Sequence, residues 1–179
     1  MCVDWKNAIR KKREAKDEYF RSDPHSPILP EDRDSFDGLS YYPVDASYRF
    51  ELLLHECADK GTTTVGTSTG SEQVYVQWGE FRFELAGERV RIQAYKREPD
   101  DNRLWVPLRD ATSGEETYGA GRYLDLERET HQVDEDKWIL DFNEAYNPTY
   151  AYADHYECPL PPTENWLRVP IEAGEKAYK

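Results

Sequence analysis

Apolar and polar residues alternate along most of residues 74–94, and this period of two most restricts how the chain can fold. A strand points successive side chains to opposite faces of a sheet, so an alternating pattern predicts a half-buried strand. The alternation breaks near Gly79 and again at Ala86 and Gly87, which favours a tight turn at each place. The region therefore predicts a three-stranded antiparallel meander over residues 74–78, 81–85 and 90–94.

Further short strands are predicted from runs of β-branched, aromatic and aliphatic residues. They cover residues 48–54, 62–67, 104–108, 123–126, 138–142 and 166–171. One helix is predicted before Pro24, with Asp4 as its cap, because apolar residues recur on one side of residues 5–20. This pattern indicates a mainly β fold, an antiparallel sandwich or barrel-like sheet with one N-terminal α-helix.

The length of 179 residues predicts a single domain over residues 1–179. Within it we expect the N-terminal helix over residues 1–22, an irregular connection over residues 23–47 and a β domain over residues 48–179. Hydrophobic residues make up only 38% of the chain, but five Trp, thirteen Tyr and six Phe can supply a large aromatic core. We therefore do not expect a disordered chain.

The formal net charge of -13 restricts the partners of the protein. Such a charge repels phosphate backbones and anionic lipids, so neither nucleic acid nor a membrane surface is an expected partner. An acidic surface also suits high salt, where screening removes self-repulsion, so we expect a halophilic protein.

Motifs for cofactors, metals and common catalytic machinery are missing from the sequence. It lacks the glycine-rich phosphate and dinucleotide loops, and its histidines and its cysteines, Cys2, Cys57 and Cys158, show no metal-ligand spacing. We expect no metal, no cofactor and no disulfide framework, and the catalytic residues are unknown. Without an apolar signal segment, a cytoplasmic monomer or homodimer is expected.

Residues 109–124 form the first candidate binding segment, a loop with three glycines that leads to Arg122 at the start of a strand. A guanidinium there can bind a carboxylate or phosphate of a ligand through two N–H donors. Tyr118 from the same loop is a further candidate binding residue. The structural interpretation is that Arg122 neutralises a local acid, Asp110 or Glu116, and thereby fixes the loop.

Residues 143–165 form the second candidate segment, a stiff polar flap rich in proline, asparagine and tyrosine. Its candidate binding residues are Asn143, Tyr146, Asn147, Glu164 and Asn165. As a pocket wall, their side chains would orient a small polar or anionic ligand between the flap and the Arg122 loop. The alternative is a structural or protein-interaction module without catalytic activity. Whether the chain is an enzyme stays open.

The chain resembles the family called domain of unknown function 1684. The resemblance runs through residues 36–43, 48–49, 110–114, 116–118, 121–124, 140–143, 145–148, 158–162, 164–165 and 173–175. Members of this bacterial and haloarchaeal family carry no established activity, so the resemblance implies a shared scaffold without assigned catalytic residues. One departure is Tyr150, where the family usually has a cysteine, so this chain cannot pair that position with Cys158.

Overall fold

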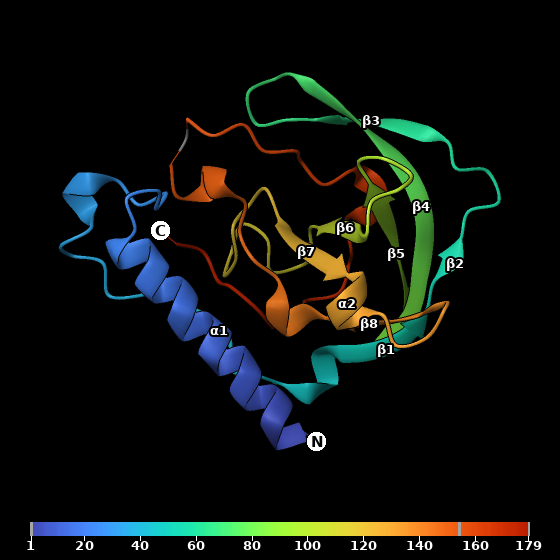
Figure 1. Ribbon diagram of the computed structural model, residues 1–179, viewed down its shortest axis with the longest axis horizontal. Helices are drawn as coiled ribbons and strands as arrows, with labels where there is room; N and C mark the ends of the chain where they lie inside the picture. The colour runs from blue at the N-terminus through green and yellow to red at the C-terminus, as the bar shows by residue number, and fades with distance from the viewer. Residues whose placement is uncertain (1, 154, 179) are drawn as a thin grey trace.

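Eight strands form two antiparallel sheets in the computed structural model, which describes residues 2–153 and 155–178 (Figure 1). The strands are β1 (Arg49–Leu53), β2 (His55–Glu56), β3 (Thr62–Gly66), β4 (Glu72–Leu85), β5 (Glu88–Lys96), β6 (Arg103–Leu108), β7 (Arg122–Glu127) and β8 (Lys137–Asp141). The helices are α1 (Cys2–Ser22) and the single turn α2 (Arg128–His131). Short 3-10 turns lie at Pro30–Asp32, Ala46–Tyr48, Phe142–Glu144, Thr149–Ala151 and Thr163–Asn165.

The larger sheet has the order β2-β4-β5-β6-β7. Strand β3 pairs with the first residues of β4, from Glu72 to Val76, and β2 pairs with Gly79 and Glu80 further along the same strand. Strands β1 and β8 form the second sheet, in which Arg49 lies opposite Asp141. Among the described residues the larger sheet does not close on itself. The predicted fold class, mainly antiparallel β with one N-terminal helix, is therefore confirmed, and the larger sheet is open rather than closed into a barrel.

The main core lies between the two sheets, because their alternating strands turn one apolar face toward each other. Phe81, Ile92, Leu104 and Leu140 are all fully buried there. Phe50 from β1 packs against Phe83 from β4, with ring centres 4.8 Å apart. The opposite face of β5, β6 and β7 lies outside this core, so its side chains are available for other contacts.

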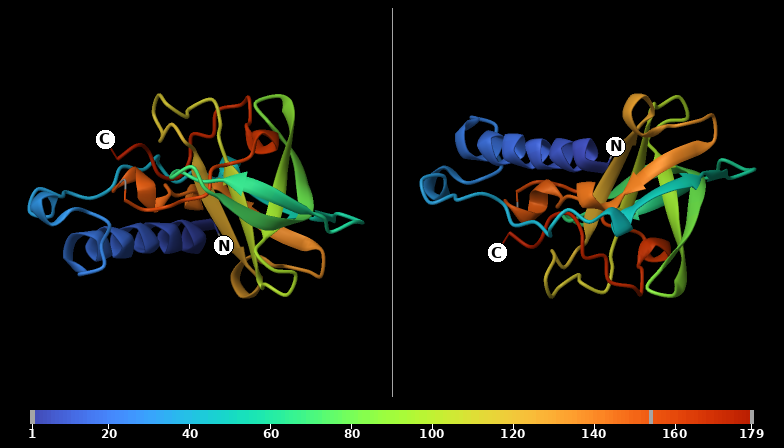
Figure 2. Two further views of the ribbon diagram at one scale, coloured as in Figure 1. Left: turned by 90° about the horizontal axis from the view of Figure 1, so that it is seen from above. Right: turned by 90° about the horizontal axis from the view of Figure 1, so that it is seen from below.

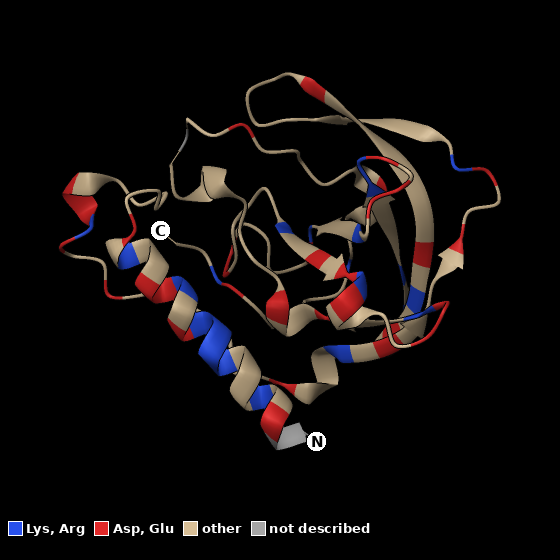
Figure 3. Cartoon of the chain, viewed as in Figure 1, with Lys and Arg blue, Asp and Glu red and all other residues tan. Residues whose placement is uncertain are grey.

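Helix α1 lies to one side of the sheets, along the last third of the chain (Figure 2). It carries both signs of charge along its length (Figure 3), and it docks through the buried side chains of Ile9 and Phe20 as well as through polar contacts. The Trp5 indole donates to Asp141 at 2.7 Å, and Lys12 pairs with Glu144 at 2.8 Å. The helix begins at Cys2, so Asp4 lies in its first turn and the prediction of Asp4 as the cap was wrong.

The predicted turn near Gly79 was wrong, because β4 runs without interruption from Glu72 to Leu85. A bulge between Gln77 and Gly79 takes its place. Glycine is needed there because an added Cβ would lie 2.8 Å from Leu54 Cδ1 and 3.0 Å from the His55 carbonyl oxygen. The turn at Ala86 and Gly87 is present, with φ of 53° and 78°.

The strand predicted over residues 166–171 is also absent. Val169 and Ile171 are buried as an apolar strand would require, but the segment makes only scattered contacts with the chain around Arg109. Pro170 supplies no amide hydrogen for a ladder, so apolar content alone misled the prediction. None of the described helices is both long and apolar enough to cross a bilayer.

Candidate functional site

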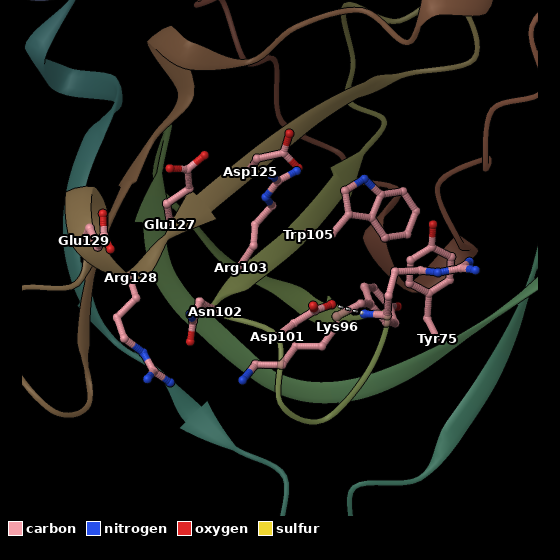
Figure 4. Close-up of a pocket in the computed structure, with 12 residues that line it drawn as sticks. Tyr75, Lys96, Asp101, Asn102, Arg103, Trp105, Asp125, Glu127, Arg128 and Glu129 are labelled. Atoms are coloured by element: carbon pink, nitrogen blue, oxygen red, sulfur yellow. Dashed lines mark hydrogen bonds between the residues drawn. The ribbon is translucent and has the colours of Figure 1, made fainter.

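A cavity of about 550 Å³ opens beside β5, β6 and β7, next to the turn that joins β5 to β6 (Figure 4). Its lining combines aromatic residues with both signs of charge. These residues include Tyr75, Tyr95, Lys96, Arg97, Asp101, Asn102, Arg103, Trp105, Asp125, Glu127, Arg128 and Glu129. The cavity lies within the size range of small-molecule sites.

The register of the sheet explains why these side chains meet. Tyr95 of β5 lies opposite Trp105 of β6, and Trp105 lies opposite Asp125 of β7, so the three share one face. Leu104 and Leu126, which also lie opposite each other, are buried in the main core on the other face. The alternation that builds the core therefore also builds the floor of the cavity.

The aromatic part of the lining is rigid and flat. The rings of Tyr75 and Trp105 are stacked, with centres 4.5 Å apart and planes 22° from parallel. The Arg97 guanidinium lies 5.0 Å from the centre of the Tyr75 ring and donates to Gln73 at 3.0 Å. Arg97 is thus already held by the protein itself.

Lys96 has an unusual environment for a lysine. Its side chain is buried, with 6% of the residue exposed, and its Nζ lies 3.7 Å from the centre of the Trp78 ring. Among the described residues no carboxylate oxygen lies within 4.0 Å of that Nζ. Burial lowers the pKa of Lys96, and the positive charge of Arg128 lowers it further.

Asp125 and Tyr146 form a hydrogen-bonded pair at the edge of the cavity. The Tyr146 hydroxyl donates to the Asp125 carboxylate, and the Arg103 side chain points toward that carboxylate (Figure 4). Burial raises the pKa of Asp125, although the hydrogen bond from Tyr146 and the charge of Arg103 act in the opposite direction. A carboxyl group whose pKa is raised beside an open cavity is a feature of many functional sites.

Arg122, the central residue of the predicted site, lies elsewhere and is fully buried. Its guanidinium donates to the carbonyl oxygens of Ile171 at 2.9 Å, of Glu175 at 3.1 Å and of Ala173. It also lies 3.4 Å from the Asp110 carboxylate, and burial lowers its pKa against the attraction of that acid. Arg122 therefore ties β7 to the C-terminal segment.

Two of the predicted asparagines have similar roles. The Asn165 side chain donates to the carbonyl oxygens of Gln93 at 3.0 Å and Pro107 at 2.7 Å, and accepts from the Gln93 amide. The Asn143 side chain donates to the Asp45 carbonyl oxygen and to the Asp141 carboxylate, each at 2.8 Å. Both side chains join segments that are far apart in the sequence.

The third asparagine, Asn147, donates to the Lys176 carbonyl oxygen at 3.0 Å. Its Oδ1 is buried without a partner among the described residues. Tyr118 lies close to Tyr150, with ring centres 6.4 Å apart, and burial raises its pKa to about 12. Neither side chain lines the cavity.

Two of the seven predicted residues do reach the cavity, through residues that line it. Tyr146 binds Asp125, and Glu164 accepts the Tyr95 hydroxyl at 2.5 Å. Asn143 lines a smaller cavity together with Tyr146, whereas Arg122, Asn147, Asn165 and Tyr118 line neither cavity. The ligand-binding role of the seven stays a prediction.

Sequence reasoning missed Lys96, Arg128 and Trp105, although one of them carried a signal. Lys96 continues the alternation of Val90, Ile92 and Ala94, so a charged residue stands where the pattern expects an apolar one. Arg128 comes directly after β7 and has no comparable signal. The described part of the chain contains no group of three or more His, Cys, Asp or Glu side chains arranged to hold a metal ion.

Comparison with known proteins identifies the family. The family model described as "Protein of unknown function (DUF1684)" matches residues 34–176, which include the Arg122 loop and the flap. An uncharacterized protein of Haloarcula marismortui, solved by solution NMR, is 39% identical with a TM-score of 0.75, over 98% of this chain and 95% of that chain. No curated protein matches the sequence. The chain belongs to the DUF1684 family of proteins of unknown function.

Proposed function

We propose that the chain binds a small anionic ligand in the cavity beside β5, β6 and β7. Lys96 carries this proposal, because its side chain is largely buried and its ammonium has no carboxylate oxygen within 4.0 Å among the described residues. A buried charge is costly unless it is paired, and a bound anion would supply the missing partner. The proposal keeps the class of ligand predicted from the sequence and moves its position from the Arg122 loop to this cavity.

Arg128 is the second cation available to the ligand. Among the described residues, its guanidinium has no carboxylate within 4.0 Å. The charges of Lys96 and Arg128 interact, and in the view of Figure 4 the two side chains end near each other. Arg97 is held by Gln73 and Tyr75, and Arg103 points toward Asp125, so these two arginines contribute less.

Two residues of the flap bind side chains that line this cavity. Tyr146 holds the Asp125 carboxylate, and Glu164 fixes the Tyr95 hydroxyl. The stacked rings of Tyr75 and Trp105 supply a flat wall that suits the apolar part of a ligand. A molecule with one or two carboxylates or a phosphate on a short carbon frame fits a cavity of about 550 Å³.

Calorimetric titration with lactate, pyruvate and inorganic phosphate tests the proposal. Lys96→Met should weaken binding of the preferred anion by about 2 kcal/mol or more, since it removes one partner of a buried charge pair. Lys60→Met is the matched control. Lys60 lies 4.9 Å from the same Trp78 ring, but it is paired with Glu56 at 3.1 Å. Equal losses in both variants, or binding that survives Lys96→Met unchanged, would contradict the proposal.

The alternative function is a structural or protein-interaction module. The observation that favours it is the use of Arg122, Asn143 and Asn165, whose side chains bind backbone carbonyl groups rather than face a cavity. If none of the anions binds at millimolar concentration, this alternative becomes the better account of the polar loops. A cytoplasmic monomer or homodimer remains our proposal for either function, supported by the free thiols of Cys57 and Cys158.

A further inference from the structure

His131 lies next to the proposed anion site without lining it. It is the last residue of the turn α2 and is buried, although the other residues of that turn are exposed. It lines a separate cavity of about 410 Å³. Asp125 and Glu127 line this cavity as well as the one beside β5, β6 and β7, so the two cavities are neighbours.

Both nitrogens of the His131 ring have partners. Nδ1 accepts the backbone N–H of Glu127 at 3.0 Å, and Nε2 lies 3.0 Å from the Glu144 carboxylate. Burial acts to raise the pKa of Glu144, but the hydrogen bonds from His131 and Lys12 outweigh it and lower the pKa. An amide N–H only donates and an ionised carboxylate only accepts, so the ring is neutral and carries its hydrogen on Nε2.

The hydrogen bond from Glu127 to Nδ1 fixes the start of α2. Glu127 directly precedes the turn, and its own side chain forms no cap. A side chain that reaches back to the first amide of a helix satisfies a donor that the helix itself leaves without a partner. Arg128 is the next residue: its amide donates to the Asn102 carbonyl oxygen at 3.0 Å, and its side chain lines the anion site. The position of Arg128 thus depends on a hydrogen bond that only the neutral His131 ring accepts.

We propose that His131 is a positioning residue of the anion site, an inference that rests on the proposed function. The neutral ring holds the Glu127 amide and thereby keeps the Arg128 guanidinium at the cavity. A proton on Nδ1 replaces the acceptor by a donor that faces the Glu127 N–H, so the hydrogen bond is lost and the turn opens. Anion binding therefore weakens as pH falls through the range in which histidine titrates, about 6.5.

The charge of the added proton acts in the opposite direction. The charged and titratable groups around the ring are Lys12 from α1, Arg103 opposite Glu127 in the sheet, Asp125, Glu127, Glu144 and Tyr146. Arg128 and Glu129 lie in the same turn as His131. One more positive charge among these groups would attract an anion and strengthen its binding in acid. The direction of the pH effect therefore separates positioning from simple attraction.

Two substitutions of His131 separate the two ring nitrogens. In His131→Asn the amide oxygen takes the place of Nδ1, so the variant accepts the Glu127 N–H and does not titrate. In His131→Gln the amide takes the place of Nε2, so the contact with Glu144 is kept and the acceptor for Glu127 is lost. His25→Asn is the control, since the His25 side chain is 88% exposed and lines neither cavity.

Calorimetric titration of the full chain at pH values of about 8 and about 5.5, on either side of the histidine range, tests the proposal. The titrant is whichever of lactate, pyruvate and inorganic phosphate binds most tightly. Each wild-type dissociation constant is divided by that of His131→Asn, which cancels any change in the charge of the anion. We expect a ratio of about 1 at the higher pH and about 5 at the lower, the effect of about one net hydrogen bond. His25→Asn should behave as the wild type, and His131→Gln should bind about fivefold more weakly at the higher pH.

Nitrogen NMR of the wild-type ring checks the same step without a ligand. At the higher pH the hydrogen should be on Nε2, and at the lower pH the Glu127 amide should exchange faster with solvent relative to its neighbours. A hydrogen on Nδ1 at the higher pH, or a ratio of dissociation constants that stays at 1 or falls below it in acid, overturns the positioning role and leaves the anion site standing. If no anion binds the wild type at either pH, the anion site fails and the positioning role fails with it.

Discussion

The guanidinium of Arg122 and the carboxylate of Asp110 lie 3.4 Å apart, and both side chains are completely shielded from solvent. The carboxylate also accepts the Ile171 amide at 2.6 Å and the Thr112 hydroxyl at 2.8 Å. Because the same guanidinium binds three carbonyl oxygens of the C-terminal segment, the pair connects the loop before β7 with the end of the chain. Removing one partner leaves the other charge buried and unpaired.

Arg122→Met should therefore lower the free energy of unfolding by about 3–5 kcal/mol, as measured by urea denaturation. Arg89→Met is the control, since the Arg89 side chain is 93% exposed and should change stability by no more than about 0.5 kcal/mol. An Arg122→Met variant that is as stable as the wild type but no longer binds anions would support the sequence-based ligand role instead.

A second prediction concerns the close approach of the chain at Gly121. Its φ is 105°, and an added Cβ would collide with the Leu108 carbonyl oxygen and lie 2.9 Å from Pro161 Cγ. Gly70 has a similar φ of 86°, but an added Cβ would meet nothing within 4 Å. Gly121→Ala should cost about 1–3 kcal/mol more than Gly70→Ala in urea denaturation, because only the first adds overpacking to backbone strain. Equal costs would mean that the contacts at Gly121 relax freely.

The sequence predicts most of the strands because the period of two survives wherever one face of the sheet is buried. Strands β1, β3, β6, β7 and β8 lie where runs of β-branched, aromatic and aliphatic residues predict them. Gly79 marks the limit of this reasoning. A glycine at a break in the alternation fits a turn as well as it fits a bulge. The close contact of Gly79 with Leu54, which lies between β1 and β2, decides between them.

The candidate site was harder to predict, because burial of a polar group depends on the tertiary fold. Arg122 and Asn165 belong to motifs typical of binding loops, but their donors meet backbone carbonyl groups of segments more than forty residues away in sequence. Lys96 is the opposite case: a charged residue in an apolar position. The alternation of β5 indicates that residue 96 is buried, but the contact of Lys96 with Trp78 from β4 depends on the tertiary fold.

A third prediction follows from the pKa of Asp125, which burial raises. A carboxyl group with a raised pKa in the folded state favours folding when it is protonated, so its contribution is fully present below the unfolded pKa and lost as pH rises through the folded value. Asp125→Asn cannot ionise, and its amide oxygen can still accept the Tyr146 hydroxyl. The stability of the variant relative to wild type should therefore increase as pH rises above about 4, the usual range of an Asp.

Urea denaturation at several pH values between about 4 and about 8 measures this difference. Asp59→Asn, at an exposed position, serves as the control and should give a curve parallel to wild type. Parallel curves for Asp125→Asn as well would show that Asp125 has no raised pKa in the folded protein.

The last prediction concerns the net charge of -13. Between about 0.1 M and about 1 M salt the Debye length falls from about 10 Å to about 3 Å, so repulsion among the exposed acids is screened. The melting temperature should therefore climb steeply with KCl. A triple variant with Gln at the exposed positions Glu72, Glu88 and Glu98 removes part of that repulsion, so it should melt higher at low salt and respond less to added KCl. If the wild-type melting temperature stays flat in KCl, the acidic surface is not an adaptation to high salt.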